Sequence, residues 1–138
     1  FLNESENIFD LLKMFEIFTQ NNSDLDFEFI LVDDGSTDNS LELLKGAEVN
    51  INVKVIKLSR NSGSHAALRA GIENVKGDEI VFYYADMQDP INVILDMRKA
   101  YQKGNDIVWA TRKSDATADA ETRPMVAMFR EAGCYDWL

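Results

Sequence analysis

The feature that most constrains the fold is the regular alternation of helix-like and strand-like segments up to residue 111. Apolar residues at helical spacing, together with capping residues, predict four helices, and short runs of β-branched and aromatic residues predict four strands. The predicted helices cover residues 7–18, 36–44, 63–75 and 89–103, and the predicted strands cover residues 27–32, 51–58, 79–84 and 106–111. A helix separates each strand from the next, and such crossover connections join parallel strands. The sequence therefore predicts an α/β fold with a mainly parallel sheet and helices on both faces.

Capping residues set the expected starts of two of these helices. Ser5 stands just before the first helical stretch, where its hydroxyl can accept a backbone N–H of the first turn. Asp89 precedes Pro90, and proline is favoured at the first position of a helix. From residue 124 onward the sequence indicates at most a short helix. We expect one domain over residues 1–138.

The composition excludes several classes of protein. The formal net charge is −10, which argues against a surface that binds nucleic acid. With one cysteine (Cys134) and one histidine (His65), the chain has no internal disulfide and no zinc site built on several such ligands. We expect an inert Cys134 thiol and a solvated or packed His65. No apolar stretch approaches the roughly 20 residues of a membrane-spanning helix, so we expect a soluble domain on the cytoplasmic side.

Polar residues follow each predicted strand. In open parallel sheets, ligands bind beyond the carboxyl ends of the strands, so these residues form the candidate site. They are Asp33 and Asp34 after the first strand, Arg60 after the second, Asp86, Gln88 and Asp89 after the third, and Arg112 after the fourth.

The acidic residues of this set also have structural interpretations. Asp33 and Asp34 stand before a Gly-Ser pair and could simply form the turn and cap the next helix. For Asp89 a helix cap is the better interpretation. Asp86 has no such obvious capping role, and its carboxylate and the amide oxygen of Gln88 are hard ligands suited to Mg²⁺ or Mn²⁺.

Five motifs occur here in the order and spacing of the family 2 glycosyltransferases. They are FLNE at residues 1–4, ILVDDGSTDNS at 30–40, LSRNSGSHAALRAGI at 58–72, YADMQDP at 84–90 and IVWATR at 107–112. The chain most closely resembles the branch that moves a sugar from a nucleotide-sugar to a polyprenyl phosphate. The resemblance implies a GT-A fold, which is a Rossmann-like three-layer sandwich.

The resemblance also implies a nucleoside site. The family's opening motif, Pro-x-x-Asn-Glu, follows its first strand; Asn3 and Glu4 match it, and the proline and strand would lie before Phe1. We therefore expect a chain that is truncated at both ends and lacks that strand. In the family, the glutamate and the aspartates of the Asp-Asp-Gly-Ser turn hold the nucleoside. That assigns nucleotide-sugar binding to Glu4, Asp33 and Asp34.

A metal site is the next implication of the resemblance. The family's motif is Asp-x-Asp-x-Gln, of which Asp86 and Gln88 match the last two ligands, while Tyr84 replaces the first aspartate. The resemblance thus implies that Asp86 and Gln88, with Asp89, bind Mg²⁺ or Mn²⁺ on the donor diphosphate. Asp86 is then the one carboxylate left of the motif's pair.

The expected reaction is an inverting transfer of the sugar. Because negative charge develops on the leaving diphosphate, cations stabilise the transition state, and we expect Asp86 and Arg112 to be the catalytic residues. The resemblance implies that Arg112 closes over the donor, and Arg60 and Ala85 complete the expected donor-binding set. A polyprenyl phosphate acceptor is already an anion and needs no general base, whereas a saccharide hydroxyl would need one.

The expected partners are a UDP- or GDP-linked sugar and a lipid-phosphate or saccharide acceptor, as in the assembly of cell-envelope polysaccharides. The protein would act at the cytoplasmic face of the membrane and contact it through parts beyond residue 138; a homo-oligomer remains open. One alternative is a phospho-receiver signalling domain, because ILVDD and the later Asp86 have a similar spacing there. That domain's Lys-Pro pair is absent, and Arg112 is the nearest cation. Another alternative is a donor-binding fragment without turnover.

Overall fold

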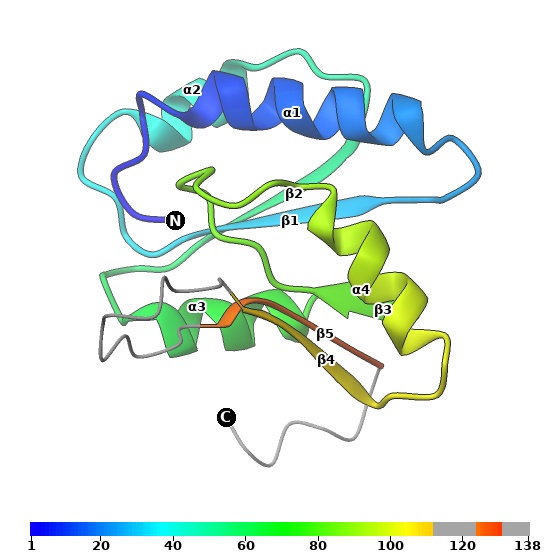
Figure 1. Cartoon of the computed structure of the whole chain (residues 1–138). Coiled ribbons are helices and arrows are strands. Elements are labelled where there is room, and N and C mark those ends of the chain that lie inside the picture. The colour runs from blue at the N-terminus through cyan, green and yellow to red at the C-terminus, as the bar shows by residue number, and fades with distance from the viewer. Residues whose placement is uncertain (112–123, 131–138) are drawn as a thin grey trace, which may run out of the picture. The chain divides into compact units, whose positions relative to one another are not determined.

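The computed structural model describes residues 1–111 and 124–130 of the chain (Figure 1). They divide into two compact units. Residues Phe1–Gly77 and Ala85–Met87 belong to the first, and Asp78–Tyr84 with the described residues 88–111 and 124–130 belong to the second. The expectation of a single domain stays a prediction.

The first unit is a three-layer α/β structure. Strand β1 (Glu28–Asp33) pairs in parallel with β2 (Asn52–Lys57), in register from Glu28 opposite Asn52 to Asp33 opposite Lys57. Helices α1 (Ile8–Asn21) and α2 (Ser40–Gly46) lie on one face of this pair, and α3 (Ser64–Ile72) lies on the other (Figure 1). The predicted α/β class, with parallel pairing and helices on both faces, is confirmed.

Helix α1 forms because its apolar residues recur every three or four positions and build one buried face. The buried residues are Ile8, Leu11, Leu12, Phe15 and Phe18. The ring of Phe15 stacks on that of Phe29 in β1, with 4.2 Å between centroids, and Phe18 meets Phe27 at 5.1 Å. Ser5 was expected to cap this helix, but the residue before its first turn is Asn7. Ser5 is engaged elsewhere, since its N–H donates to Asp38.

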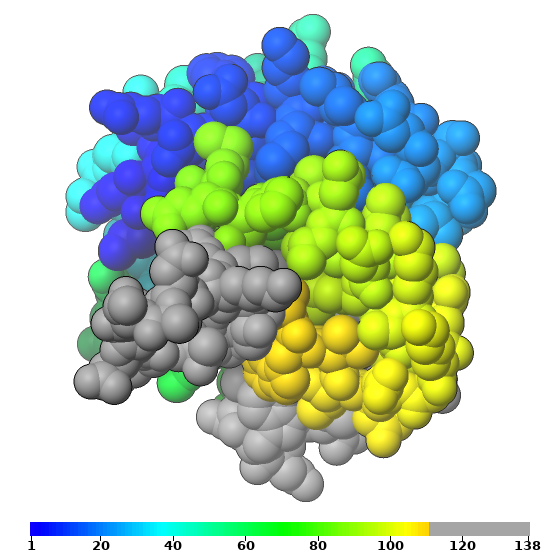
Figure 2. Space-filling view, in the orientation of Figure 1, coloured from blue at the N-terminus to red at the C-terminus, as the bar shows by residue number. Residues whose placement is uncertain are grey.

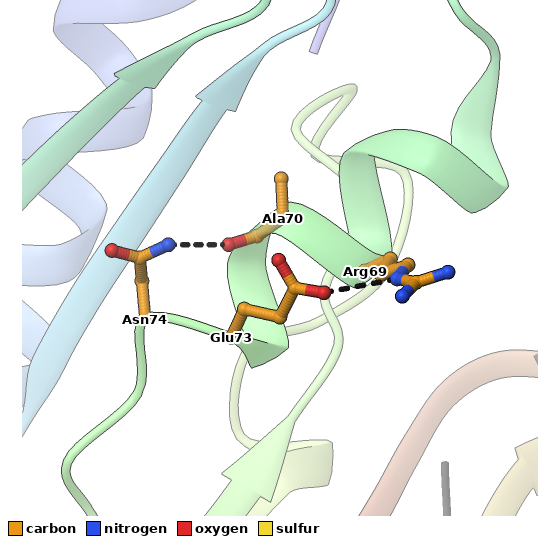
Figure 3. A network of polar contacts seen from close by, with 4 residues as sticks. All are labelled: Arg69, Ala70, Glu73 and Asn74. Carbon is orange, nitrogen blue, oxygen red and sulfur yellow. Dashed lines mark hydrogen bonds and ion pairs between the residues drawn. The ribbon is translucent and has the colours of Figure 1, made fainter. Parts of the chain in front are cut away.

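Helix α3 lies close to the sheet because its sheet-facing side is built of small residues. A Cβ on Gly71 would stand 3.5 Å from a methyl group of Val32 in β1, which is ordinary van der Waals contact, so the helix lies within direct packing distance of the strand. Beyond the helix end, the Asn74 amide donates to the Ala70 carbonyl, while the Arg69 guanidinium pairs with Glu73 at 2.9 Å (Figure 3). The amine of Lys54 in β2 donates to the Asn74 side chain at 2.8 Å and ties this end of α3 to the strand.

The second unit is a three-stranded sheet with one helix. Its strands are β3 (Glu79–Val81), β4 (Ile107–Thr111) and β5 (Pro124–Arg130), in the order β3-β5-β4. Strand β5 is antiparallel to both neighbours, so β3 and β4 run in the same direction. The sequence indicated at most a short helix from residue 124 onward, and that expectation was wrong, because residues 124–130 form a strand.

Helix α4 (Val93–Tyr101) covers the core of the second unit. Met97 and Tyr101 are buried, and Val81 and Val108 pack against them. The helix was expected to start at Asp89, but it begins at Val93 after single turns in which the N–H groups of residues 93–95 bond three residues back. Its expected end is confirmed, since Gly104 adopts a positive φ of 100° just beyond it. In the described part of the chain, no helix is long and apolar enough to cross a membrane.

Replacing Phe15 tests the packing of α1 on β1. Phe15→Ala should lower the free energy of unfolding by about 3–5 kcal/mol, because it leaves a cavity under a ring that is 6% exposed and stacked on Phe29. The matched control is Phe9→Ala on the same helix, whose residues form much of the blue surface in Figure 2. Phe9 is 56% exposed, so its loss should cost under about 1 kcal/mol. Equal costs in urea denaturation would contradict this packing.

Candidate functional site

Three segments of the first unit meet at the carboxyl ends of β1 and β2. They are the N-terminal segment (residues 1–5), the β1–α2 loop (residues 34–39) and the β2–α3 loop (residues 58–63). The two strands end at the same edge because they are parallel and Asp33 pairs with Lys57. The pairing extends one step further, where the Leu58 N–H donates to the Asp33 carbonyl at 2.9 Å. Three of the five sequence motifs therefore lie at one edge of a sheet, as the sequence predicted for these two strands.

The carboxylate of Asp34 holds the β2–α3 loop. One of its oxygens accepts the N–H of Ser62 at 2.7 Å and the other accepts the N–H of Gly63 at 2.9 Å. Asp34 is 6% exposed, so two charge-assisted hydrogen bonds compensate the burial of this carboxylate. Asp34 thus joins the end of β1 to the start of α3, and both of its oxygens are used.

Gly35 allows the two loops to lie against each other. Its φ is +77°, and a Cβ at this position would stand 2.5 Å from the carbonyl carbon of Arg60 and 2.6 Å from the Asn61 nitrogen. Both neighbours are backbone atoms, which cannot swing aside as the end of a side chain can. Only glycine fits here without moving the β2–α3 loop, on which the exposed Arg60 lies.

Asp33 differs from Asp34 in its hydrogen bonding. It is 0% exposed, and one oxygen accepts the Ser36 N–H at 2.8 Å, which closes the turn after β1. The other oxygen, Oδ2, is buried and has no hydrogen-bond partner within the described residues. A buried carboxylate oxygen without a donor is costly, and an N–H or O–H group of a ligand would remove that cost.

The N-terminal segment places further groups beside this pair. The Phe1 amino group donates to the Val32 carbonyl at 2.7 Å, and the Phe1 carbonyl accepts the Asp34 N–H at 2.9 Å. Phe1 is therefore bonded to the end of β1 as a parallel strand would be, and a strand before Phe1 stays a prediction. Burial lowers the pKa of the Phe1 amino group. The carboxylates of Asp33, Asp34 and Glu4 act on that pKa in the opposite direction.

Asn3 fastens the N-terminal segment to the β1–α2 loop. Its N–H donates to the Ser36 hydroxyl at 2.9 Å, and its side-chain oxygen accepts the N–H groups of Thr37 at 2.9 Å and Asp38 at 3.3 Å. The φ of Asn3 is +55°, a conformation that asparagine adopts more readily than most residues. The Asn-Glu and Asp-Asp-Gly-Ser motifs thus form one hydrogen-bonded structure.

Asp38 and Ser40 complete this structure, and the sequence analysis did not select either residue for the site. The Asp38 carboxylate accepts the Ser40 hydroxyl at 2.6 Å, the Ser40 N–H at 3.0 Å and the Ser5 N–H at 3.1 Å. The bond from the Ser40 hydroxyl is the main cause that lowers the pKa of Asp38 from 3.8 to about 2. The sequence predicts only a helix over residues 36–44, whose start explains the bond to Ser40 but not the bond to Ser5.

The expected metal ligands follow β3. Asp86 lies in the segment Ala85–Met87, which belongs to the first unit, and Asp86 and Gln88 are both exposed. Asp89 is 5% exposed, and its backbone carbonyl accepts the Tyr83 hydroxyl. Among the described residues, no group of three or more His, Cys, Asp or Glu side chains could enclose a metal ion. A carboxylate and an amide oxygen are ligand types that Mg²⁺ and Mn²⁺ accept beside phosphate and water oxygens, and the metal site stays a prediction.

The remaining residues that the sequence singled out are half-buried, exposed or outside the described residues. Ala85 is half-buried, and Tyr84, which stands where the family has an aspartate, is 53% exposed, so its ring does not belong to the core. His65 is exposed in the first turn of α3, in agreement with the expected solvated histidine. Arg112 and Cys134 lie outside the described residues.

Comparisons with known proteins agree with the motifs. The model of the family described as Glycosyl transferase family 2 matches residues 3–135. An uncharacterized glycosyltransferase of Synechocystis sp. is 37% identical over 114 residues, which cover 81% of this chain and 35% of that protein. An undecaprenyl-phosphate 4-deoxy-4-formamido-L-arabinose transferase of Pseudomonas fluorescens is 42% identical over 91 residues, or 64% of this chain and 27% of the relative. The chain thus spans about a third or less of the length of these relatives.

One solved structure is similar over nearly the whole chain. The crystal structure of S. aureus TarS 1–349 in complex with UDP-GlcNAc aligns with a TM-score of 0.70 and 20% identity, and the match covers 94% of this chain and 43% of TarS. At this identity the similarity concerns the fold. It confirms the GT-A type of α/β fold that the sequence resemblance implied.

The lowered pKa of Asp38 predicts a pH dependence of stability. Because this pKa is depressed in the folded state, the stabilisation is present above the unfolded value of 3.8 and is lost as the pH falls toward about 2. In urea denaturation, the stability advantage of the wild type over Asp38→Asn should therefore shrink from about pH 5 to pH 2. The control is Asp24→Asn, at an exposed carboxylate in the turn after α1. A constant difference between the wild type and Asp38→Asn would contradict the assignment.

Proposed function

Because the chain belongs to glycosyl transferase family 2, we propose that its first unit binds the nucleotide of a nucleotide-sugar and that the whole protein transfers the sugar to a polyprenyl phosphate. The observation that carries the nucleotide site is the buried, unpaired Oδ2 of Asp33 at an edge where three motifs meet. The relatives named as undecaprenyl-phosphate sugar transferases support the acceptor class. The TarS complex with UDP-GlcNAc makes a UDP-sugar the first donor to test.

The two aspartates have different parts in this proposal. Asp34 positions the loop that carries Arg60, and Gly35 allows the close contact of that loop with the turn after β1. Asp33 would accept an N–H or O–H group of the nucleoside through its Oδ2, with the Glu4 carboxylate nearby. A nucleoside has such donors on its base and its ribose. Recognition by a buried acceptor is selective because a ligand without a matching donor leaves the oxygen unpaired.

The chemistry at the diphosphate requires positive charge. Asp86 and Gln88, with Asp89 next to them in sequence, would hold Mg²⁺ or Mn²⁺, which when bound neutralises the charge that develops on the leaving diphosphate. Arg60, and Arg112 in the same role, would add to this stabilisation. The acceptor phosphate is an anion and attacks without a general base, and a lipid acceptor would place the reaction at the cytoplasmic face of a membrane.

Two alternative functions were considered from the sequence, a phospho-receiver domain and a donor-binding fragment without turnover. The family match over residues 3–135 replaces the phospho-receiver interpretation. In addition, the Asp34 carboxylate already accepts two backbone N–H groups, whereas a receiver needs its acidic pair for a metal. A donor-binding piece without turnover would bind the nucleotide as an active enzyme does. Measurements of nucleotide affinity therefore test the site in either case.

Asp33→Asn tests the nucleoside contact. Asparagine can keep the turn with its one oxygen but presents an NH₂ group where Oδ2 was. It should therefore weaken binding of UDP and of UDP-GlcNAc equally, by about 1–3 kcal/mol, the scale for a lost buried polar partner. Isothermal titration measures both affinities, and Asp24→Asn is the control. If the wild type binds GDP or dTDP but not UDP, the same comparison is made with that nucleotide. Unchanged affinity in Asp33→Asn would show that the pair only forms a turn.

Asp86→Asn tests the metal ligand. It should abolish the part of UDP affinity that Mn²⁺ adds in the wild type, because the motif retains one carboxylate to bridge protein and cation. Tyr84→Asp restores the missing carboxylate and should increase the Mn²⁺ effect, since Tyr84 is 53% exposed and its loss leaves no core cavity. Titrations with Mn²⁺ and with EDTA give the two quantities. An equal Mn²⁺ effect in Asp86→Asn and the wild type would exclude Asp86 as the ligand.

A further inference from the structure

We propose that Asp38 is a positioning residue of the donor site, which holds the backbone at Glu4 and Ser5 in place without touching the nucleotide. The inference rests on the proposed function, because it concerns the geometry of the same site. Asp38 lies in the β1–α2 loop, more than thirty residues along the chain from the segment that it holds. Its effect on the donor would pass through two short paths of hydrogen bonds.

The first path is direct. The Oδ2 atom of Asp38 accepts the N–H of Ser5 at 3.1 Å. Ser5 belongs to the N-terminal segment, whose residues 1–5 form neither helix nor strand, so its backbone N–H groups need partners from elsewhere. A carboxylate oxygen is a stronger acceptor for such an N–H than a neutral oxygen.

The second path passes through Ser40. This residue is 0% exposed, and its hydroxyl donates to the Oδ1 atom of Asp38 at 2.6 Å. The hydroxyl has one proton, and once Asp38 accepts it, the oxygen is left to accept the N–H of Glu4, which it does at 3.0 Å. The carboxylate therefore sets the orientation of the hydroxyl, and the hydroxyl holds Glu4.

The two paths reach consecutive residues, and this has a consequence for the Glu4 side chain. The Glu4 carbonyl accepts the N–H groups of Asn7 and Ile8 at the start of α1, and the Glu4 carboxylate accepts the Asn7 side chain at 2.7 Å. The residue is thus fixed to α1 on one side and to the β1–α2 loop on the other. Without the bonds that depend on Asp38, Glu4 would stay bonded to α1 but would lose its attachment to the β1–α2 loop, which carries the turn after Asp33.

Asp38 also has a local role, from which the positioning role must be separated. Its Oδ1 accepts the Ser40 N–H at 3.0 Å at the start of α2, as a helix cap does. Asp38→Asn separates the two roles. The asparagine oxygen can keep both bonds to Ser40, while its NH₂ group would face the Ser5 N–H, and two donors cannot bond. Ser40→Ala removes the second path instead, because Glu4 loses its acceptor.

The experiment uses the full chain and measures two quantities for each variant. Hydrogen exchange compares the amides of Glu4 and Ser5 with those of Leu43 and Leu44 in α2, and isothermal titration gives the affinity for UDP. In Asp38→Asn, exchange at Ser5 should accelerate at least about tenfold while the α2 amides keep their rates. Ser40→Ala should accelerate exchange at Glu4. UDP affinity should fall at least about fivefold in both variants and stay unchanged in Asp24→Asn.

Two other outcomes would overturn the proposal, and a third would contradict the proposed function instead. If exchange at Ser5 accelerates but UDP binds Asp38→Asn as it binds the wild type, Asp38 is a structural residue and the proposal is overturned. Unchanged exchange at both Glu4 and Ser5 overturns it as well, because the hydrogen bonds then do not hold the segment. If the wild type binds neither UDP nor GDP nor dTDP, the proposed function fails instead, and that result is visible before any variant is made.

Discussion

The two hydrogen bonds from the amides of Ser62 and Gly63 to the Asp34 carboxylate are the interaction on which the site depends. They join the turn after β1 to the first turn of α3, on the opposite face of the sheet from α1 and α2. Their geometry requires the β1–α2 and β2–α3 loops to touch, and Gly35 makes that contact possible because any side chain there would meet the Arg60–Asn61 peptide. The position of Arg60, and the surroundings of Asp33, follow from this contact.

The site is fixed mainly by backbone N–H groups that bond to side-chain oxygens. Asp33, Asp34, Asp38, Asn3 and Ser40 each accept at least one such N–H from another residue. Loops beyond the end of a sheet have no ladder partners, so short polar side chains must replace them. This explains the composition of the motifs. They are rich in Asp, Asn and Ser because these short side chains accept backbone N–H groups, and in Gly because it leaves the backbone free to turn and to approach another segment closely. Within this set, Asp33 alone has a buried side-chain oxygen without a hydrogen-bond partner among the described residues.

The sequence predicted the order of elements and the edge at which polar residues gather, because both follow from periodicity and from the rule for crossover connections. The sequence did not distinguish the role of Asp33 from that of Asp34, because the two roles depend on where the β2–α3 loop lies. The expected Ser5 cap failed because the Glu4 carbonyl accepts the N–H groups of Asn7 and Ile8, which places Ser5 inside a turn and Asn7 at the cap position. Strand β5 was missed because the short apolar run at residues 125–129 is compatible with a helix as well as a strand, and pairing with β3 and β4 makes it a strand.

The different roles proposed for these residues also limit which substitutions the motifs can accept. A residue whose two side-chain oxygens each accept an N–H group, such as Asp34, has no acceptable substitute among neutral residues, because asparagine would place a donor against one of those groups. A residue that reaches solvent, such as Tyr84, is under no such constraint and can replace the aspartate of the family motif without disturbing the fold. We therefore expect the departure at Tyr84 to affect ligand binding rather than folding. All contacts that shape the proposed nucleoside site lie within the first unit, so nucleotide binding can be retained even where the metal motif has changed.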